Sequence, residues 1–130
     1  MQSLDVRVFV VDDEPSIAST LADILRMSGF AATAFTNPLE ALEAARHHAP
    51  HLLVSDVAMP ALSGIELAIE LKRMDLDCNI LLFSGHSATH DLLNQARARG
   101  FDFQVLPKPL PPQRLIEEAS AIEWTTTATV

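Results

Sequence analysis

The amino-acid sequence predicts a single domain of the α/β class, a doubly wound parallel sheet of five strands with five helices on its two faces. Two observations indicate this class. Short apolar segments alternate five times with longer segments whose apolar residues recur every three or four positions, the spacing of one helix face. The length of 130 residues suits one domain with a buried core. Strict alternation of strand and helix gives right-handed crossovers between parallel strands.

The first strand, helix and second strand are expected before residue 36. Val6–Val11 is apolar and β-branched, as in a strand buried on both faces. Pro15 stands where a helix can begin, and Gly29 stands where that helix can end. Phe30–Phe35 follows as a second and less apolar strand. These three segments make up the first strand–helix–strand unit of the sheet.

The middle of the chain supplies the second and third helices and the third strand. Asn37–Glu40 reads NPLE, which has the elements of a capping box, and it predicts a helix up to about His48. Leu52–Ser55 is expected as the third strand because it is a short apolar run. Leu62 opens the apolar pattern of a third helix that ends near Met74.

The last third of the chain supplies two more strands and two more helices. Ile80–Phe83 and Phe103–Leu106 are expected as the fourth and fifth strands. Ser87 can cap the helix between them, and Gly100 can end it. Pro111 and Pro112 open a fifth helix. We expect the domain to span residues 1–124 and residues 125–130 to form a frayed polar tail.

Composition limits the functions that the chain can have. The net charge of −8 at pH 7 opposes binding to nucleic acid and to anionic membranes, because both are polyanions. The single cysteine, Cys78, excludes an internal disulfide and suits a reducing compartment. No apolar run is long enough to span a membrane, and the N-terminus lacks the features of a signal peptide. We therefore expect a cytoplasmic location.

Polar side chains follow four of the expected strands. Asp12 and Asp13 follow the first strand, Asp56 ends the third, Ser84 ends the fourth and Lys108 follows the fifth. Each has an ordinary explanation by itself, such as a turn, a helix cap or a solvated charge. Together they meet at one edge, because the carboxyl ends of parallel strands lie side by side and form the usual ligand crevice.

This set of side chains favours phosphoryl chemistry with a metal ion. Three carboxylates at one place repel one another, and a divalent cation removes that repulsion. Ligands that are oxygen atoms alone suggest Mg²⁺, which pairs with phosphate. A carboxylate can act as the nucleophile and form an aspartyl-phosphate, while Mg²⁺ and Lys108 neutralise the charge on the phosphoryl oxygens.

The chain resembles the receiver domains of two-component response regulators, and the resemblance covers nearly all of its length. Four motifs in the same order carry it: VVDDEP at Val10–Pro15, SDVAMP at Ser55–Pro60 with Gly64 after it, SG at Ser84–Gly85 and PKP at Pro107–Pro109. The resemblance implies a flavodoxin-like sheet with the strand order 2-1-3-4-5, for which a chemotaxis regulator of this family is an example.

The resemblance implies a role for each carboxylate. Asp56 is expected to be the phosphoacceptor. Asp12, Asp13 and Asp56 are expected to bind Mg²⁺ through their carboxylates, and Ala58 through its backbone carbonyl. The cofactor is therefore expected to be Mg²⁺.

The resemblance also implies roles at the fourth and fifth strands. Lys108 is expected to pair with the phosphoryl group and to share the catalytic work with Asp56. Ser84, followed by Gly85, is expected to be the switch hydroxyl that moves toward the phosphoryl oxygens. The peptide bond between Lys108 and Pro109 is expected to be cis.

One position departs from the family. Receiver domains usually have Tyr or Phe three positions before the conserved lysine, and this chain has Val105, which cannot act as a rotating aromatic side chain. Phe103 lies two residues earlier, on the same face of an ideal strand, and can substitute for it. With Val105 at this position, we expect phosphorylation to change the surface mainly through Ser84 and the loop after the fourth strand.

The expected function is that of a phosphorelay receiver rather than an enzyme. The donor would be a sensor histidine kinase or a phosphotransfer protein, and the output an unknown protein partner, with no nucleic acid and no membrane bound by this chain. The chain then acts alone through protein contacts, or it is a receiver cut from a longer regulator. Two alternatives remain: an interaction module that never binds phosphate, and a Mg²⁺-dependent phosphatase, although Ala58 stands where such enzymes carry a second aspartate.

Overall fold

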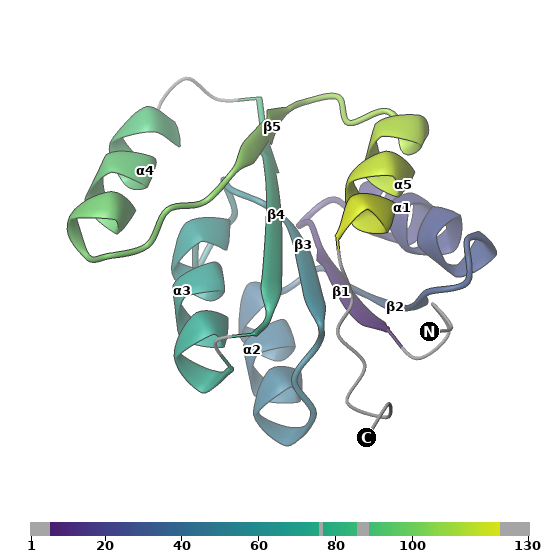
Figure 1. Ribbon diagram of the computed structural model, residues 1–130, viewed down its shortest axis with the longest axis horizontal. Coiled ribbons are helices and arrows are strands. Elements are labelled where there is room, and N and C mark those ends of the chain that lie inside the picture. Colours follow the sequence, from purple (N-terminus) through teal and green to yellow (C-terminus); the bar gives the residue numbers. More distant parts are fainter. Residues whose placement is uncertain (1–5, 76, 86–88, 123–130) are drawn as a thin grey trace.

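The computed structural model describes residues 6–75, 77–85 and 89–122 of the chain. It contains one sheet of five parallel strands in the order β2-β1-β3-β4-β5, and this confirms the predicted fold class (Figure 1). The strands are β1 (Arg7–Val11), β2 (Ala31–Phe35), β3 (Leu52–Asp56), β4 (Asn79–Ser84) and β5 (Val105–Pro107). The helices are α1 (Pro15–Met27), α2 (Pro38–His47), α3 (Gly64–Met74), α4 (Thr89–Ala98) and α5 (Pro112–Ala121).

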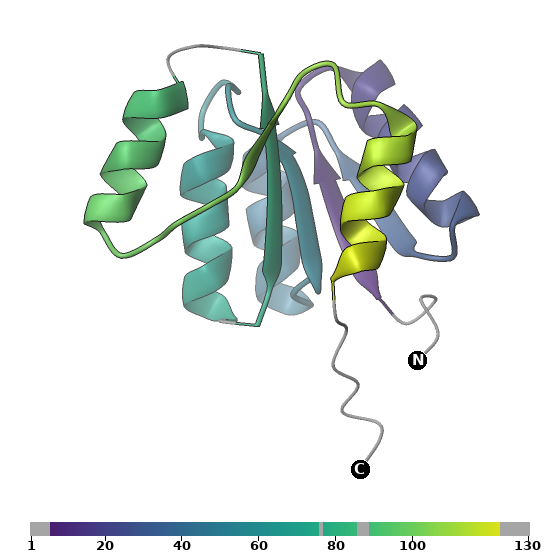
Figure 2. The same cartoon turned by 45° about the horizontal axis from the view of Figure 1, so that its top comes forward.

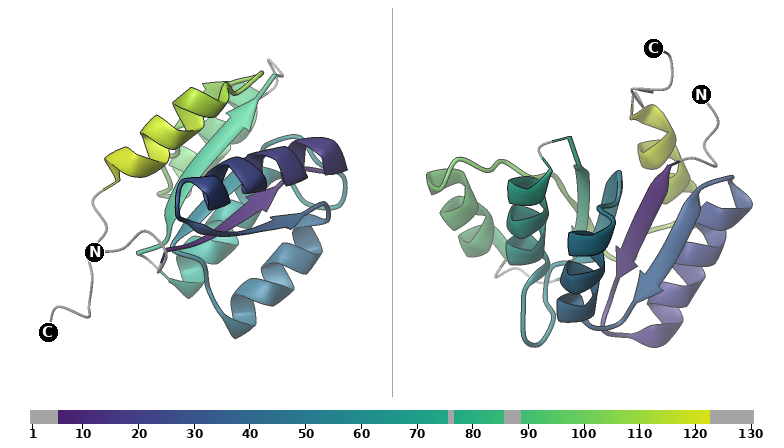
Figure 3. Two further views of the ribbon diagram at one scale, coloured as in Figure 1. Left: turned by 90° about the vertical axis from the view of Figure 1, so that its right-hand side faces the viewer. Right: turned by 90° about the horizontal axis from the view of Figure 1, so that it is seen from below.

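The helices cover both faces of the sheet and bury two apolar clusters. Helices α1 and α5 lie on one face, and α2, α3 and α4 lie on the other (Figures 2 and 3). The α1–α5 face packs on side chains of β1, β3 and β4, and the helices contribute Leu21, Leu25, Leu115 and Ala119. The opposite face is filled mainly by α2 and α3, and Ala96 of α4 is also buried there. Every central strand is therefore buried on two sides, as the apolar runs predicted.

Local sequence signals fix where the helices begin. Asn37 accepts a hydrogen bond from the backbone N–H of Leu39 at 2.9 Å, which confirms it as the cap of α2. Ser63 caps α3 by accepting from the backbone N–H of Glu66 at 3.1 Å. The strand register then places Asp56 opposite Phe83, and Ser84 opposite Pro107. The polar ends of β3, β4 and β5 are therefore adjacent.

The structure differs from the sequence-based expectation most clearly at the fifth strand. Strand β5 begins at Val105, two residues later than expected, and Phe103 precedes it outside the strand. The rings of Phe101 and Phe103 stack instead, with their centroids 6.0 Å apart, in the cluster beneath α4. The expected cap at Ser87 and the tail at 125–130 lie outside the described residues. Within the described part of the chain, no helix is both long and apolar enough to cross a membrane.

Candidate functional site

The carboxylates at the ends of β1 and β3 come together. One oxygen each of Asp12, Asp13 and Asp56 lies within 4.8 Å of the others. Asp12 is 0% exposed and Asp56 is 4% exposed, whereas Asp13 faces solvent. Asp12 and Asp13 follow β1, and β1 pairs directly with β3, which Asp56 ends. The order of the strands therefore brings these acidic groups together.

The arrangement of these oxygens suits a bound cation. Asp12 Oδ1 accepts the backbone N–H of Glu14 at 2.9 Å, which fixes the orientation of this carboxylate. Among the described residues, Asp12 Oδ2 and Asp56 Oδ1 are buried without a hydrogen-bond partner, although Asp12 Oδ2 has a long ion pair with Lys108 Nζ at 3.4 Å. A buried oxygen without any such contact costs about 1–3 kcal/mol. A hard divalent cation would bind these oxygens, so the donor set fits Mg²⁺.

Lys108 supplies the positive charge of the site. Its Nζ lies 3.4 Å from Asp12 Oδ2 and 3.4 Å from Asp56 Oδ2, and its side chain is 24% exposed. Both distances exceed the ~2.7–2.9 Å of a tight charge-assisted bond. The ammonium therefore lies between two carboxylates and forms a tight ion pair with neither of them.

Burial and charge act in opposite directions on these groups. Burial raises the pKa of the Asp56 carboxyl; Lys108 lowers it, and Asp12 and Asp13 raise it, so the net shift is upward. Burial lowers the pKa of Lys108, but the charges of Asp12 and Asp56 outweigh burial and the net shift is upward. The pair therefore stabilises the charged lysine, while the ionised form of Asp56 stays disfavoured.

The backbone of Asp56 is held by two neighbours that sequence reasoning did not assign. The buried hydroxyl of Ser55 donates to the Asp56 carbonyl at 2.9 Å. Gly64 donates its backbone N–H to Val57 O at 2.8 Å, and a Cβ at Gly64 would collide with the Asp56 carbonyl. In the sequence, the glycine at position 64 was the feature that could have indicated this close approach, because glycine has no Cβ.

The expected switch residues lie at the ends of β4 and β5. Ser84 is buried, and its carbonyl accepts the backbone N–H of Lys108 at 3.1 Å. Gly85 is exposed beside the stem of Lys108, and the Lys108–Pro109 peptide bond is cis. Ala58 lies exposed two residues after Asp56. The roles expected for these residues and for the carboxylates stay predictions.

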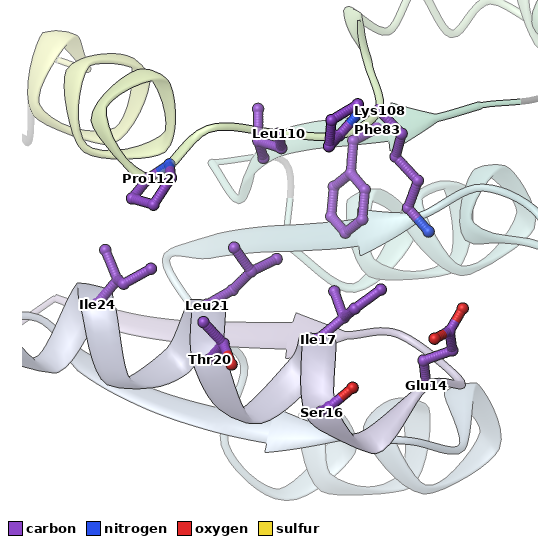
Figure 4. Close-up of a pocket in the computed structure, with 11 residues that line it drawn as sticks. Glu14, Ser16, Ile17, Thr20, Leu21, Ile24, Phe83, Lys108, Leu110 and Pro112 are labelled. Atoms are coloured by element: carbon purple, nitrogen blue, oxygen red, sulfur yellow. The ribbon is translucent and has the colours of Figure 1, made fainter.

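A groove adjoins the site between α1 and the β5–α5 connection. It has a volume of about 570 Å³. Its walls combine apolar side chains of α1 and of the β5–α5 connection with the ring of Phe83, and Lys108 lies at one end (Figure 4). The Lys108 ammonium lies 5.4 Å from the centroid of the Phe83 ring. This contact was a second feature that sequence reasoning did not identify.

Comparison with known proteins identifies sequence relatives. The family model of the response regulator receiver domain matches residues 8–120. The transcriptional regulatory protein PrrA of Mycobacterium tuberculosis is 34% identical over 101 residues, 78% of this chain and 43% of PrrA. A response regulator receiver protein of Anaeromyxobacter sp. is 37% identical over 111 residues, 85% of this chain and 46% of that protein. The chain thus spans less than half the length of these relatives.

Solved structures share the fold. Chemotaxis protein CheY4 of Vibrio cholerae superposes with a TM-score of 0.77 at 23% identity, over 91% of this chain and 98% of that one. A CheY-like receiver domain protein of Methanospirillum hungatei gives a TM-score of 0.79 at 21% identity, over 88% and 90%. At these identities the likeness concerns the fold alone. The sequence matches go further, and they show that the chain belongs to the response regulator receiver domain family.

Proposed function

We propose that the chain accepts a phosphoryl group on Asp56 from a phosphohistidine of a sensor histidine kinase or phosphotransfer protein. The observation that carries the proposal is the position of the Asp56 carboxylate. It is buried, it lacks a hydrogen-bond partner at Oδ1 among the described residues, and it lies beside two further carboxylates and 3.4 Å from Lys108 Nζ. A nucleophile, a cation site and a fixed ammonium therefore share one crevice.

The transfer uses the chain's own residues in simple roles. A carboxylate oxygen of Asp56 forms a bond to phosphorus while the bond between phosphorus and the donor's imidazole nitrogen breaks, and the electron pair of that bond stays on the nitrogen. Lys108 Nζ already lies 3.4 Å from Asp56 Oδ2, so it can pair with the phosphoryl oxygens after little movement. Ser84, followed by Gly85, then donates its hydroxyl to one of those oxygens.

The metal would be held by the carboxylates of Asp12, Asp13 and Asp56 and by the backbone carbonyl of Ala58. When bound, Mg²⁺ supplies positive charge to the phosphoryl oxygens. The two buried carboxylate oxygens without hydrogen-bond partners support this assignment, because carboxylate oxygens are the ligands that Mg²⁺ prefers.

The two alternatives have less support. A phosphatase that passes through aspartyl-phosphate needs an acid–base group near the nucleophile, and the side chain of Ala58 offers none. An interaction module without phosphate has no need for three clustered carboxylates beside a lysine. Relatives such as PrrA are named transcriptional regulators. For this chain we propose a protein as the downstream partner and the cytoplasm as the location.

The test is intact mass spectrometry after incubation with a small acyl-phosphate, with and without Mg²⁺. The chain should gain one phosphoryl group in a Mg²⁺-dependent manner, and Asp56→Asn should gain none. Asp102→Asn is the matched control, because its side chain is 81% exposed, and it should be labelled like the parent chain. Undiminished labelling of Asp56→Asn would move the acceptor to another residue.

A further inference from the structure

We propose that Phe83 is a positioning residue for the phosphorylation reaction, because the face of its ring holds the Lys108 ammonium between Asp12 and Asp56. This inference rests on the proposed function, since it concerns the lysine that would pair with the phosphoryl group. Phe83 itself does not reach the reacting atoms in this account. It acts through Lys108.

Phe83 is held firmly inside the sheet. It is 1% exposed, it pairs with Asp56 on one side and with Leu106 on the other, and its carbonyl accepts the backbone N–H of Val57 at 3.0 Å. Neighbouring strands therefore hold its backbone on both sides. A ring on such a backbone is a stable surface for a flexible lysine side chain.

Three successive residues at the end of β4 surround Lys108. The Phe83 ring lies 5.4 Å from Nζ, the Ser84 carbonyl accepts the Lys108 backbone N–H at 3.1 Å, and a Cβ at Gly85 would lie 3.5 Å from Lys108 Cβ. The backbone, the stem and the ammonium of the lysine are thus each placed by a different residue. The ring contact acts on the charged group.

In this proposal the ring contact, together with the opposing pull of the two carboxylates, keeps the ammonium from closing on one of them. An ammonium within about 6 Å of an aromatic centroid is attracted by the ring quadrupole. This attraction competes with the pull of Asp12 and Asp56, whose oxygens both stay at 3.4 Å. With an aliphatic residue in place of Phe83, we expect the ammonium to move into a tight pair with one carboxylate, where it is less available to an incoming phosphoryl group.

The surroundings of the ring allow a matched pair of variants. Phe83 lines the groove beside α1, and its ring faces Ile17 and Leu21 across that space (Figure 4). Phe83→Tyr keeps the aromatic face, and its hydroxyl can extend into the groove. Phe83→Leu keeps an apolar side chain but removes the aromatic face. The two variants therefore separate the effect of the ring from the effect of burial.

The test measures the rate of phosphorylation by acetyl phosphate over a range of donor concentrations at saturating Mg²⁺. The rate constant at saturating donor should fall about threefold to tenfold in Phe83→Leu and stay near the parent value in Phe83→Tyr. The dissociation constant of Mg²⁺ should rise in Phe83→Leu and stay near the parent value in Phe83→Tyr, because an ammonium that pairs tightly with Asp12 or Asp56 competes with Mg²⁺ for a proposed ligand. Where Phe83→Leu lowers the folded fraction, Phe83→Met serves as the second aliphatic variant.

A double-mutant comparison separates positioning from packing. In a Lys108→Ala background, Phe83→Leu should cause no further loss of rate, because the ring then has no ammonium to hold. An equal loss in both backgrounds would overturn the inference, as would a Phe83→Tyr variant as slow as Phe83→Leu. If the parent chain is phosphorylated and Phe83→Leu is phosphorylated at the same rate, this inference is wrong but the proposed function stands. If the parent chain is not phosphorylated at all, both the proposed function and this inference are contradicted.

Discussion

At the scale of single residues, the three carboxylates of the site are held in different ways. Asp12 is buried and oriented by the backbone of Glu14, and Asp56 is buried at the end of β3. Asp13 is exposed, and its charge raises the pKa of Asp56. Asp13 is therefore the residue whose removal should separate metal binding from folding.

Asp13→Ala should weaken Mg²⁺ binding strongly and leave the metal-free melting temperature unchanged or higher. A ligand is lost, but a repulsive charge next to Asp56 is lost too. Titration with Mg²⁺ and thermal unfolding in a chelator measure the two effects. The exposed Asp23→Ala is the control for metal binding and should bind Mg²⁺ normally. A large loss of metal-free stability in Asp13→Ala would show that this residue mainly stabilises the turn.

Asp56 should make the metal-free chain less stable as the pH rises, whereas a carboxylate with a lowered pKa makes a protein more stable as the pH rises. Its pKa is raised in the folded chain, with burial as the largest cause. The folded chain therefore binds the proton more tightly than the unfolded chain, and stability falls as pH rises from the unfolded pKa of about 3.9 through the folded pKa. Above that window the ionised carboxylate destabilises the metal-free fold.

Asp56→Asn should accordingly be more stable than the parent chain at pH 7 in a chelator, and this advantage should shrink as the pH falls through the window toward the unfolded pKa. Urea unfolding of both chains at several pH values measures the difference. A variant that is less stable than the parent at pH 7 would show that the pair with Lys108 outweighs the burial of the carboxylate.

At the scale of elements, the β3–α3 connection links Asp56 to a helix. Ser63 caps α3, and Gly64 approaches the Asp56 carbonyl so closely that no Cβ fits. Gly64→Ala should therefore displace the start of α3, destabilise the chain by about 1–3 kcal/mol and weaken Mg²⁺ binding. Calorimetry and Mg²⁺ titration measure both effects.

Gly100→Ala is the matched control for this prediction. Gly100 has φ of 92° and no atom within 4 Å of an added Cβ, so the substitution should cost about 1–2 kcal/mol of backbone strain without changing Mg²⁺ binding. Equal Mg²⁺ affinity in both glycine variants would contradict the role given to Gly64.

The elements also show what the sequence could predict. Apolar runs and helix signals located all ten elements, and the shared edge of parallel strands predicted that Asp12, Asp56 and Lys108 would meet. The start of β5 was wrong by two residues, because Phe103 has the apolar character of a strand residue but packs beneath α4. The contact between Phe83 and Lys108 joins β4 to the residue that follows β5, and no periodicity within one segment predicts it.

At the scale of the whole molecule, the residues that would transmit a change from Asp56 to the surface differ from the family pattern at Val105. Val105 is partly buried against the same cluster as Phe103, so an aliphatic side chain stands where a rotating aromatic is usual. We therefore expect Ser84, which is buried at the end of β4, to distinguish the phosphorylated state from the unphosphorylated one. A ligand shifts the equilibrium between two conformational states only when it binds one state more tightly than the other.

Ser84→Ala should still accept phosphate at Asp56 but lose most of the change in backbone chemical shifts that a phosphoryl mimic produces. The lost contact is a hydrogen bond to a charged group, worth about 1.5–3 kcal/mol. Val105→Ala should keep that response. If Val105→Ala abolishes the response and Ser84→Ala retains it, the switch depends on the β5 side chain instead.

The central claim is that Asp56 carries the phosphoryl group, and mapping of the acyl-phosphate tests it most directly. The chain is labelled with acetyl phosphate and Mg²⁺, reduced with borohydride, which converts an aspartyl-phosphate to homoserine, and digested for tandem mass spectrometry. The account predicts homoserine at position 56, only in samples that received both donor and metal. Homoserine at Asp12 or Asp13 with an unmodified Asp56 would contradict it.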